Sequence, residues 1–130
     1  MFAGYELEFE DTFDGDALDE SRWIPHYLAQ WSSREEAAAR YEVDSGSLRL
    51  LIEAGQQPWC PEFDGDVRVS SLQTGMFAGA VGSAIGQHRF NPDAVVREAQ
   101  PNVRLYTPRY GVVEMRAKAT DDPSTWSRSG

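Results

Sequence analysis

Three glutamates near the start of the chain are the first residues whose type and spacing could do chemistry. Glu6, Glu8 and Glu10 alternate with apolar residues, so an extended strand would place all three on one face. Neighbouring members would then lie about 6.6 Å apart. That separation is close to the distance at which two carboxylates cooperate in the hydrolysis of a glycosidic bond. The solvent face of an outer strand gives the same pattern, and it is the interpretation we favour.

A second acidic group could hold a metal ion. Asp11, Asp14 and Asp16 surround a glycine, and carboxylate loops are typical ligands of calcium. Their spacing lacks the regular alternation of the EF-hand loop, so we interpret the group as an acidic turn. His26 and His88 are isolated from each other and from the single cysteine, which is too little for a zinc site. We therefore assign no metal ligand in the sequence.

The elements that must position these residues are short. Alternating or apolar runs predict strands at residues 4–13, 41–43, 48–52, 67–77 and 110–119, with another near 88–90. The turn at 44–46 joins two of these strands as a hairpin. Residues 32–39 form the one good helical run, which begins with serines suited to capping and is too short to be more than a loop helix. Many strands with frequent turns predict an all-β fold, an antiparallel β-sandwich.

Composition and charge exclude several classes of function. The 130 residues fit one domain, and 41% hydrophobic residues exclude a disordered chain. A net charge of -9 argues against nucleic acid and against anionic lipid as partners. No run approaches the roughly 18 apolar residues of a membrane span. The acidic N-terminus is unlike a secretory signal, and Cys60 has no partner for an internal disulfide. We therefore expect a cytoplasmic protein, with a mature domain of a longer, secreted parent as the alternative.

Four motifs in one order give the chain a family resemblance. They are Phe9-Glu-Asp-Thr-Phe-Asp-Gly15 followed by Trp23, Asp44-Ser-Gly-Ser-Leu-Arg-Leu50, Ser71-Leu-Gln-Thr-Gly75, and Tyr110-Gly-Val-Val-Glu-Met-Arg-Ala-Lys118. Each motif alone is weak. Together they span most of residues 5–119 and resemble the first strands of glycoside hydrolase family 16.

The resemblance implies a concanavalin A-like β-jelly-roll whose concave sheet binds β-glucan or galactan chains. It also implies retaining hydrolysis or transglycosylation by two carboxylates. In the family, both carboxylates lie on a Glu-x-Asp-x-(x)-Glu strand that follows the strand similar to residues 110–118. This chain does not contain that motif. We therefore expect residues 1–123 to be the N-terminal half of such a domain, with no catalytic residue of its own and no activity alone.

The tail at residues 124–130 differs from the apolar segment expected in the family. Deleting one base from the codons ACC ATG GTC GCG CTC TGG, which encode Thr-Met-Val-Ala-Leu-Trp, yields Thr125-Trp-Ser-Arg-Ser-Gly130. This match predicts a frameshift in a longer hydrolase gene. A deliberately shortened chain or a misplaced gene end would explain the tail as well. The DNA that follows codon 130 distinguishes these explanations.

Within the resemblance, several residues are candidates for contact with the sugar. Trp31 and Trp59 fall in loop-like segments, where aromatic rings can stack on sugar faces, although covering the edge of the core is an alternative role. Further candidates for substrate binding are Gln87, His88 and Arg89 on an expected cleft strand, and Glu114 on a charged strand face. For Glu114 the alternative is a cross-strand ladder of charges.

The expected partner is a polysaccharide or oligosaccharide, and we predict no cofactor. The family often holds a structural calcium, but its ligands would have to include residues outside this chain. Half a jelly-roll would leave strand edges unpaired, which predicts self-association. Two other functions remain open, a non-catalytic carbohydrate-binding β-sandwich and a β-sandwich interaction module without a sugar ligand.

Overall fold

The computed structural model describes residues 4–118. The elements, in chain order, are the 3-10 helix η1 (Ala29–Trp31), α1 (Arg34–Ala37), β1 (Arg40–Asp44), β2 (Ser47–Leu51), α2 (Pro61–Asp64), β3 (Gly75–Met76) and β4 (Val103–Arg104). Strand β1 pairs with β2 and β3 pairs with β4, both antiparallel. The described residues are thus mostly non-helical with short antiparallel strand pairs, which agrees with the predicted class at that level. Among them, no helix is long and apolar enough to cross a membrane.

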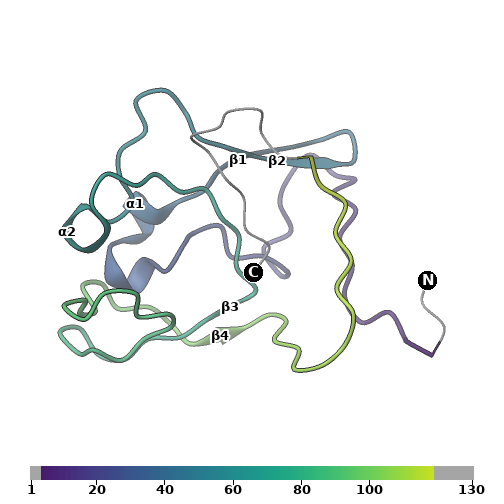
Figure 1. The fold of residues 1–130 in the computed structure, drawn as a ribbon. Coiled ribbons are helices and arrows are strands. Elements are labelled where there is room, and N and C mark those ends of the chain that lie inside the picture. The colour runs from purple at the N-terminus through teal and green to yellow at the C-terminus, as the bar shows by residue number, and fades with distance from the viewer. Residues whose placement is uncertain (1–3, 119–130) are drawn as a thin grey trace. The chain divides into compact units, whose positions relative to one another are not determined.

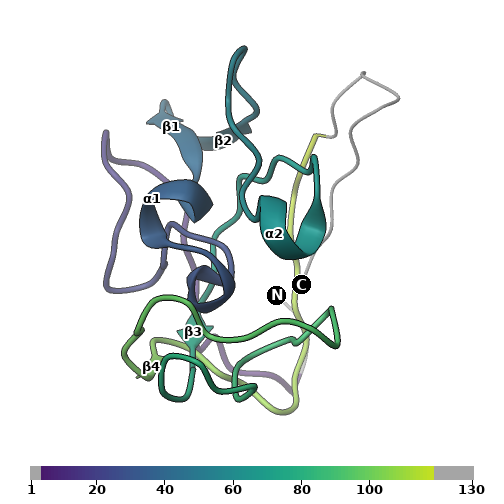
Figure 2. The same cartoon turned by 90° about the vertical axis from the view of Figure 1, so that its left-hand side faces the viewer.

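The chain divides into two compact units. Residues 8–107 form one of them and contain every helix and strand named above. The described part of the other comprises residues 4–7 and 108–118. Within the larger unit, the two strand pairs lie at opposite ends and α1 and α2 lie between them (Figures 1 and 2).

The hairpin predicted around residues 44–46 is confirmed. Ser45 and Gly46 both have positive φ angles, 52° and 77°, which is the backbone of the tight two-residue turn that suits twisted strands. The register pairs Val43 with Leu48, so these two side chains lie on one face. Val43 is buried, whereas Leu50 on the same face stays largely exposed. Self-association through unpaired strand edges remains a prediction.

The predicted loop helix is also confirmed, as the single turn α1. Ser33 is its N-cap, and its Oγ accepts a hydrogen bond from the backbone N–H of Glu36 at 3.1 Å. Glu35 and Glu36 occupy the first turn, where negative charge is favourable. The second helix, α2, begins at Pro61, whose ring presets the helical φ angle.

The strands predicted at residues 4–13 and 110–119 do not form within residues 4–118, and residue 119 lies outside the described range. The strand predicted at 67–77 shrinks to β3 and a single bridge between Gln73 and Ile24. The strand expected at 88–90 is wrong, because His88 has a left-handed φ of 50°. Alternation of apolar and polar residues indicates which side chains would share a face of a strand. A β-ladder forms only if a neighbouring strand also pairs with its backbone N–H and C=O groups.

The core of the larger unit is built around two tryptophans. Trp31 and Trp59 are the largest fully buried side chains, and Leu28, Ala37 and Val96 pack in the same cluster. Gly86 lies directly against the Trp31 ring: a Cβ atom there would come within 2.8 Å of Cζ2. The close approach of this backbone to the indole therefore requires glycine.

Replacing Gly86 with alanine should destabilise the fold. The added methyl would overlap a rigid, buried ring, and overpacking of this kind costs about 1–3 kcal/mol in the free energy of unfolding. Urea denaturation followed by tryptophan fluorescence measures the loss. Gly15→Ala is the control, because the nearest atoms there would be 3.9 Å away. Equal stability of the two variants would contradict this packing.

Candidate functional site

The two tryptophans predicted to contact sugar lie in the core. Trp31 is 0% exposed and its Nε1–H donates to the carbonyl of Gln87 at 3.0 Å. Trp59 is 1% exposed and its Nε1–H donates to Asp64 at 2.8 Å. Neither ring offers a face to a ligand in this structure, so both correspond to the alternative role of packing. The loop-like sequence around Trp31 and Trp59 does not make their side chains exposed, because both loops fold over the core.

Gln87 is half-buried and organises the backbone around it. Its carbonyl accepts hydrogen bonds from Trp31 and from the Gln30 side chain, the latter at 2.9 Å. Its own Nε2 donates to the carbonyl of Gly75 at 3.3 Å. The side-chain oxygens of Gln30 and Gln87 are buried, and among the described residues neither accepts a hydrogen bond. Gln87 thus connects Trp31 to strand β3 through these hydrogen bonds.

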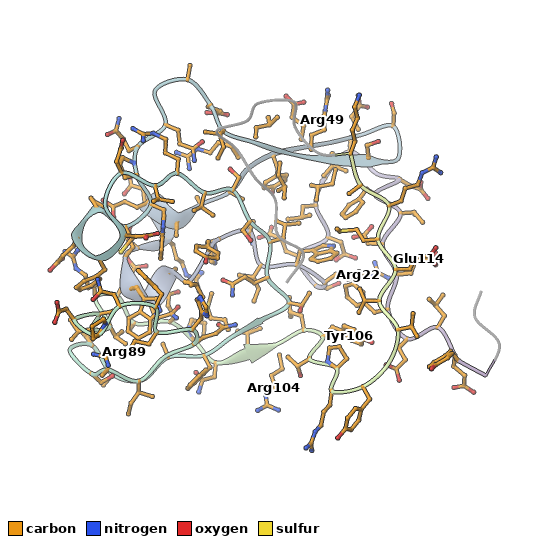
Figure 3. All side chains as sticks on the ribbon, in the orientation of Figure 1. Arg22, Arg49, Arg89, Arg104, Tyr106 and Glu114 are labelled. Carbon is orange, nitrogen blue, oxygen red and sulfur yellow. The ribbon has the colours of Figure 1, made fainter. Side chains whose placement is uncertain are left out.

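The next two predicted residues, His88 and Arg89, are exposed. Arg89 closes its own loop: its Nε donates to the carbonyl of Ala94 at 3.0 Å, and a second nitrogen donates to the carbonyl of Pro92. Figure 3 shows Arg89 beside that loop. Glu114 is exposed as well, in the smaller unit. Among the predicted residues, Trp31 contacts Gln87 through its indole N–H and packs in one buried cluster with Trp59, but neither tryptophan shares an exposed surface with His88 and Arg89.

The acidic turn has a structural use. Asp11 accepts the backbone N–H of Phe13 at 2.8 Å and the indole N–H of Trp23 at 2.7 Å. Asp14 accepts the Thr12 hydroxyl at 2.7 Å. Within residues 4–118, no cluster of three or more histidine, cysteine or acidic side chains could hold a metal ion. These hydrogen bonds connect the start of the larger unit to Trp23.

An open hollow of about 560 Å³ lies beside the β1–β2 hairpin. Its charged lining includes Glu20, Glu42, Asp44 and Arg49. Arg49 is paired with Glu42 at 2.8 Å, so its positive charge is already engaged. The hollow therefore presents mainly negative charge.

Four titratable groups among the described residues have shifted pKa values. Hydrogen bonds from Ser21 lower the pKa of Asp19. Burial lowers the pKa of His26, which favours its neutral form. The hydrogen bond from the Tyr106 hydroxyl to Glu8, 2.9 Å long, raises the pKa of that tyrosine. Burial also raises the pKa of Cys60, whose Sγ lies 3.4 Å from the carbonyl of Trp31. The raised pKa values of Tyr106 and Cys60 favour the protonated forms of these two side chains, which are weaker nucleophiles than the anions.

One exposed surface was missed by the sequence analysis. Strand β3 pairs Gly75 with Arg104 and Met76 with Val103. Met76 is buried, so the alternation turns Phe77 outward on the face that carries Arg104. Phe77 is 48% exposed. A usable signal was present, since Phe77 stands between two glycines that share its face, at positions 75 and 79.

Comparisons with known proteins show similarity to a solved structure. No family model matches the chain, and no curated protein matches it. Among solved structures, it is similar to the GlcNAcα1-4Gal releasing endo-β-galactosidase from Clostridium perfringens, with 36% sequence identity and a TM-score of 0.71. The similarity covers 85% of this chain and 26% of that protein, so the chain spans about a quarter of its length. This structural neighbour is a glycosidase.

The buried thiol of Cys60 should react slowly with thiol reagents while the protein is folded. Thiolate is the reactive form, and a raised pKa lowers its population at pH 8. Reaction with Ellman's reagent should proceed at least about tenfold more slowly than in urea, where the thiol is exposed. Equal rates under both conditions would contradict the buried position of Cys60.

Proposed function

We propose that this chain is a carbohydrate-directed part of a glycosidase of the β-sandwich, jelly-roll type found in glycoside hydrolase family 16. The observation that carries the proposal is its similarity to an endo-β-galactosidase, at 36% identity over 85% of the chain. The order of the four sequence motifs supports the same family independently of that comparison. The proposed ligands are β-linked galactan or glucan chains.

The chemistry proposed for the whole protein is retaining hydrolysis or transfer. Two carboxylates about 5–5.5 Å apart are needed, one to attack the anomeric carbon and one to protonate the leaving oxygen. We assign that pair to polypeptide other than these 130 residues, since the Glu-x-Asp-x-(x)-Glu motif is not in the sequence. Local carboxylates already have structural partners, such as Asp11 with Trp23 and Asp64 with Trp59. The proposal for the chain alone is therefore binding without cleavage.

The assignment of residues 1–123 to the first half of the domain, and of 124–130 to a frameshifted tail, is part of the same proposal. Residues 119–130 lie outside the described range. Support comes from the order of the four sequence motifs, which follows the order of the first strands in the family.

Titration with oligosaccharides tests the proposal. The purified 130-residue chain should bind a β-1,4-galactan or a β-1,3-glucan oligosaccharide in isothermal calorimetry. No reducing ends should appear, because the paired carboxylates that cleave the bond are missing. Maltohexaose, an α-linked glucan, is the control ligand. Lack of binding to both β-linked chains would overturn the carbohydrate assignment, and release of reducing ends would overturn the assignment of the catalytic pair to other polypeptide.

A further inference from the structure

The outer face of β3 and β4 brings an aromatic ring close to hydrogen-bond donors. Phe77 directly follows β3, and the register of that strand with β4, continued by one residue, places it opposite Asn102. The Asn102 side-chain oxygen accepts the backbone N–H of Ala78 at 3.1 Å, which fixes the amide beside the ring's strand. Arg104 lies on the same face, opposite Gly75.

The ring of Phe77 stands alone on its own strand. Its same-face neighbours on that strand are Gly75 and Gly79. The side chain of Thr107 lies over Gly75 and that of Ile85 lies over Gly79. On the side away from β4, the backbone N–H of Gln87 donates to the Phe77 carbonyl at 3.1 Å, and that of Gly79 donates to the Ile85 carbonyl at 2.8 Å. The ring therefore sits on the middle one of three hydrogen-bonded segments, with nearly half of its residue surface open to solvent.

Arg104 differs from the other arginines of the larger unit. Eight arginines lie between residues 8 and 107, and seven have a hydrogen bond or an ion pair. These seven are Arg22, Arg34, Arg40, Arg49, Arg68, Arg89 and Arg97. The side chain of Arg104 has neither within the described residues. Figure 3 shows it projecting from β4 away from the ribbon.

The free side-chain groups of Asn102 and Arg104 are donors. The Asn102 oxygen is already engaged, so its two amide hydrogens remain available, and a guanidinium carries donors only. Side chains directly opposite in such a pair are about 5 Å apart at Cβ, and diagonal ones about 7–8 Å. Phe77, Asn102 and Arg104 can therefore reach one small ligand together.

We propose that Phe77, Asn102 and Arg104 form a binding site for an uncharged pyranose unit of a glycan. The C–H face of the sugar stacks on the ring, and its hydroxyl oxygens accept hydrogen bonds from Asn102 and Arg104. A polyanion would also satisfy the donors, but the net charge of -9 opposes its approach. The inference rests on the proposed function and adds to it a location and a preference for uncharged sugar.

Variants of the full chain locate the site. In a titration with β-1,4-galactan oligosaccharide, Phe77→Ala should weaken binding about fivefold through loss of the stacked ring. Phe77→Leu keeps an apolar side chain and should weaken it as well, which separates stacking from general packing. Arg104→Gln should also cost about fivefold, because the guanidinium donors are lost. Val81→Ala is the matched control, an exposed apolar residue in the loop between Gly79 and Ile85, and should bind like the wild type.

The outcomes separate this inference from the proposed function. Wild-type binding that is unchanged in both Phe77→Ala and Arg104→Gln would overturn the site and leave the carbohydrate assignment intact. A wild-type chain that binds no galactan would overturn the site, and failure on β-glucan too would overturn the function. For an uncharged ligand, affinity should not change between 50 and 500 mM salt. A steep fall with salt, or tighter binding of a sulfated galactan, would overturn the preference for uncharged sugar.

Discussion

The packing of the Trp31 ring against the backbone of Gly86 is the constraint on which most of the larger unit depends. The indole is fully buried, and its N–H is satisfied by the carbonyl of Gln87, so the ring cannot shift without breaking a buried hydrogen bond. This contact holds η1 against the segment that is hydrogen-bonded to residues 77–79, directly after β3. That segment in turn fixes the outward face on which Phe77 stands. The segment that packs against Trp31 in the core therefore also positions Phe77 for the proposed sugar contact.

Local chemistry explains which elements could be predicted from the sequence. The β1–β2 hairpin is specified by a two-residue turn with positive φ angles and by apolar residues on both of its strands. Helix α1 is specified by the Ser33 cap. The runs at 4–13 and 110–118 have equally clear alternation but no ladder, because strand formation depends on a neighbour that local sequence does not encode. Pairing partners are long-range information.

The candidate site shows the same division. The family resemblance predicts a carbohydrate ligand, and the structural neighbour is a glycosidase. Individual residues were harder to place, because Trp31 and Trp59 look the same in sequence whether a loop presents them or folds over them. Phe77 and Arg104 are 27 positions apart, and only the register of β3 with β4 brings them to one face. Gly75 and Gly79 are evident in the sequence, but only the structure shows that they lie on the same face as Phe77.

The most direct test of the central claim, that this chain is built as part of a glycosidase, is a chimera. The quarter of the Clostridium perfringens endo-β-galactosidase that the chain matches would be replaced by the matching residues of this chain, and release of sugar from a galactosyl substrate would be measured. The account predicts a soluble chimera with a single cooperative melting transition and measurable hydrolysis. A chimera that folds cooperatively yet is inactive, or one that fails to fold while the parent enzyme folds, would contradict it.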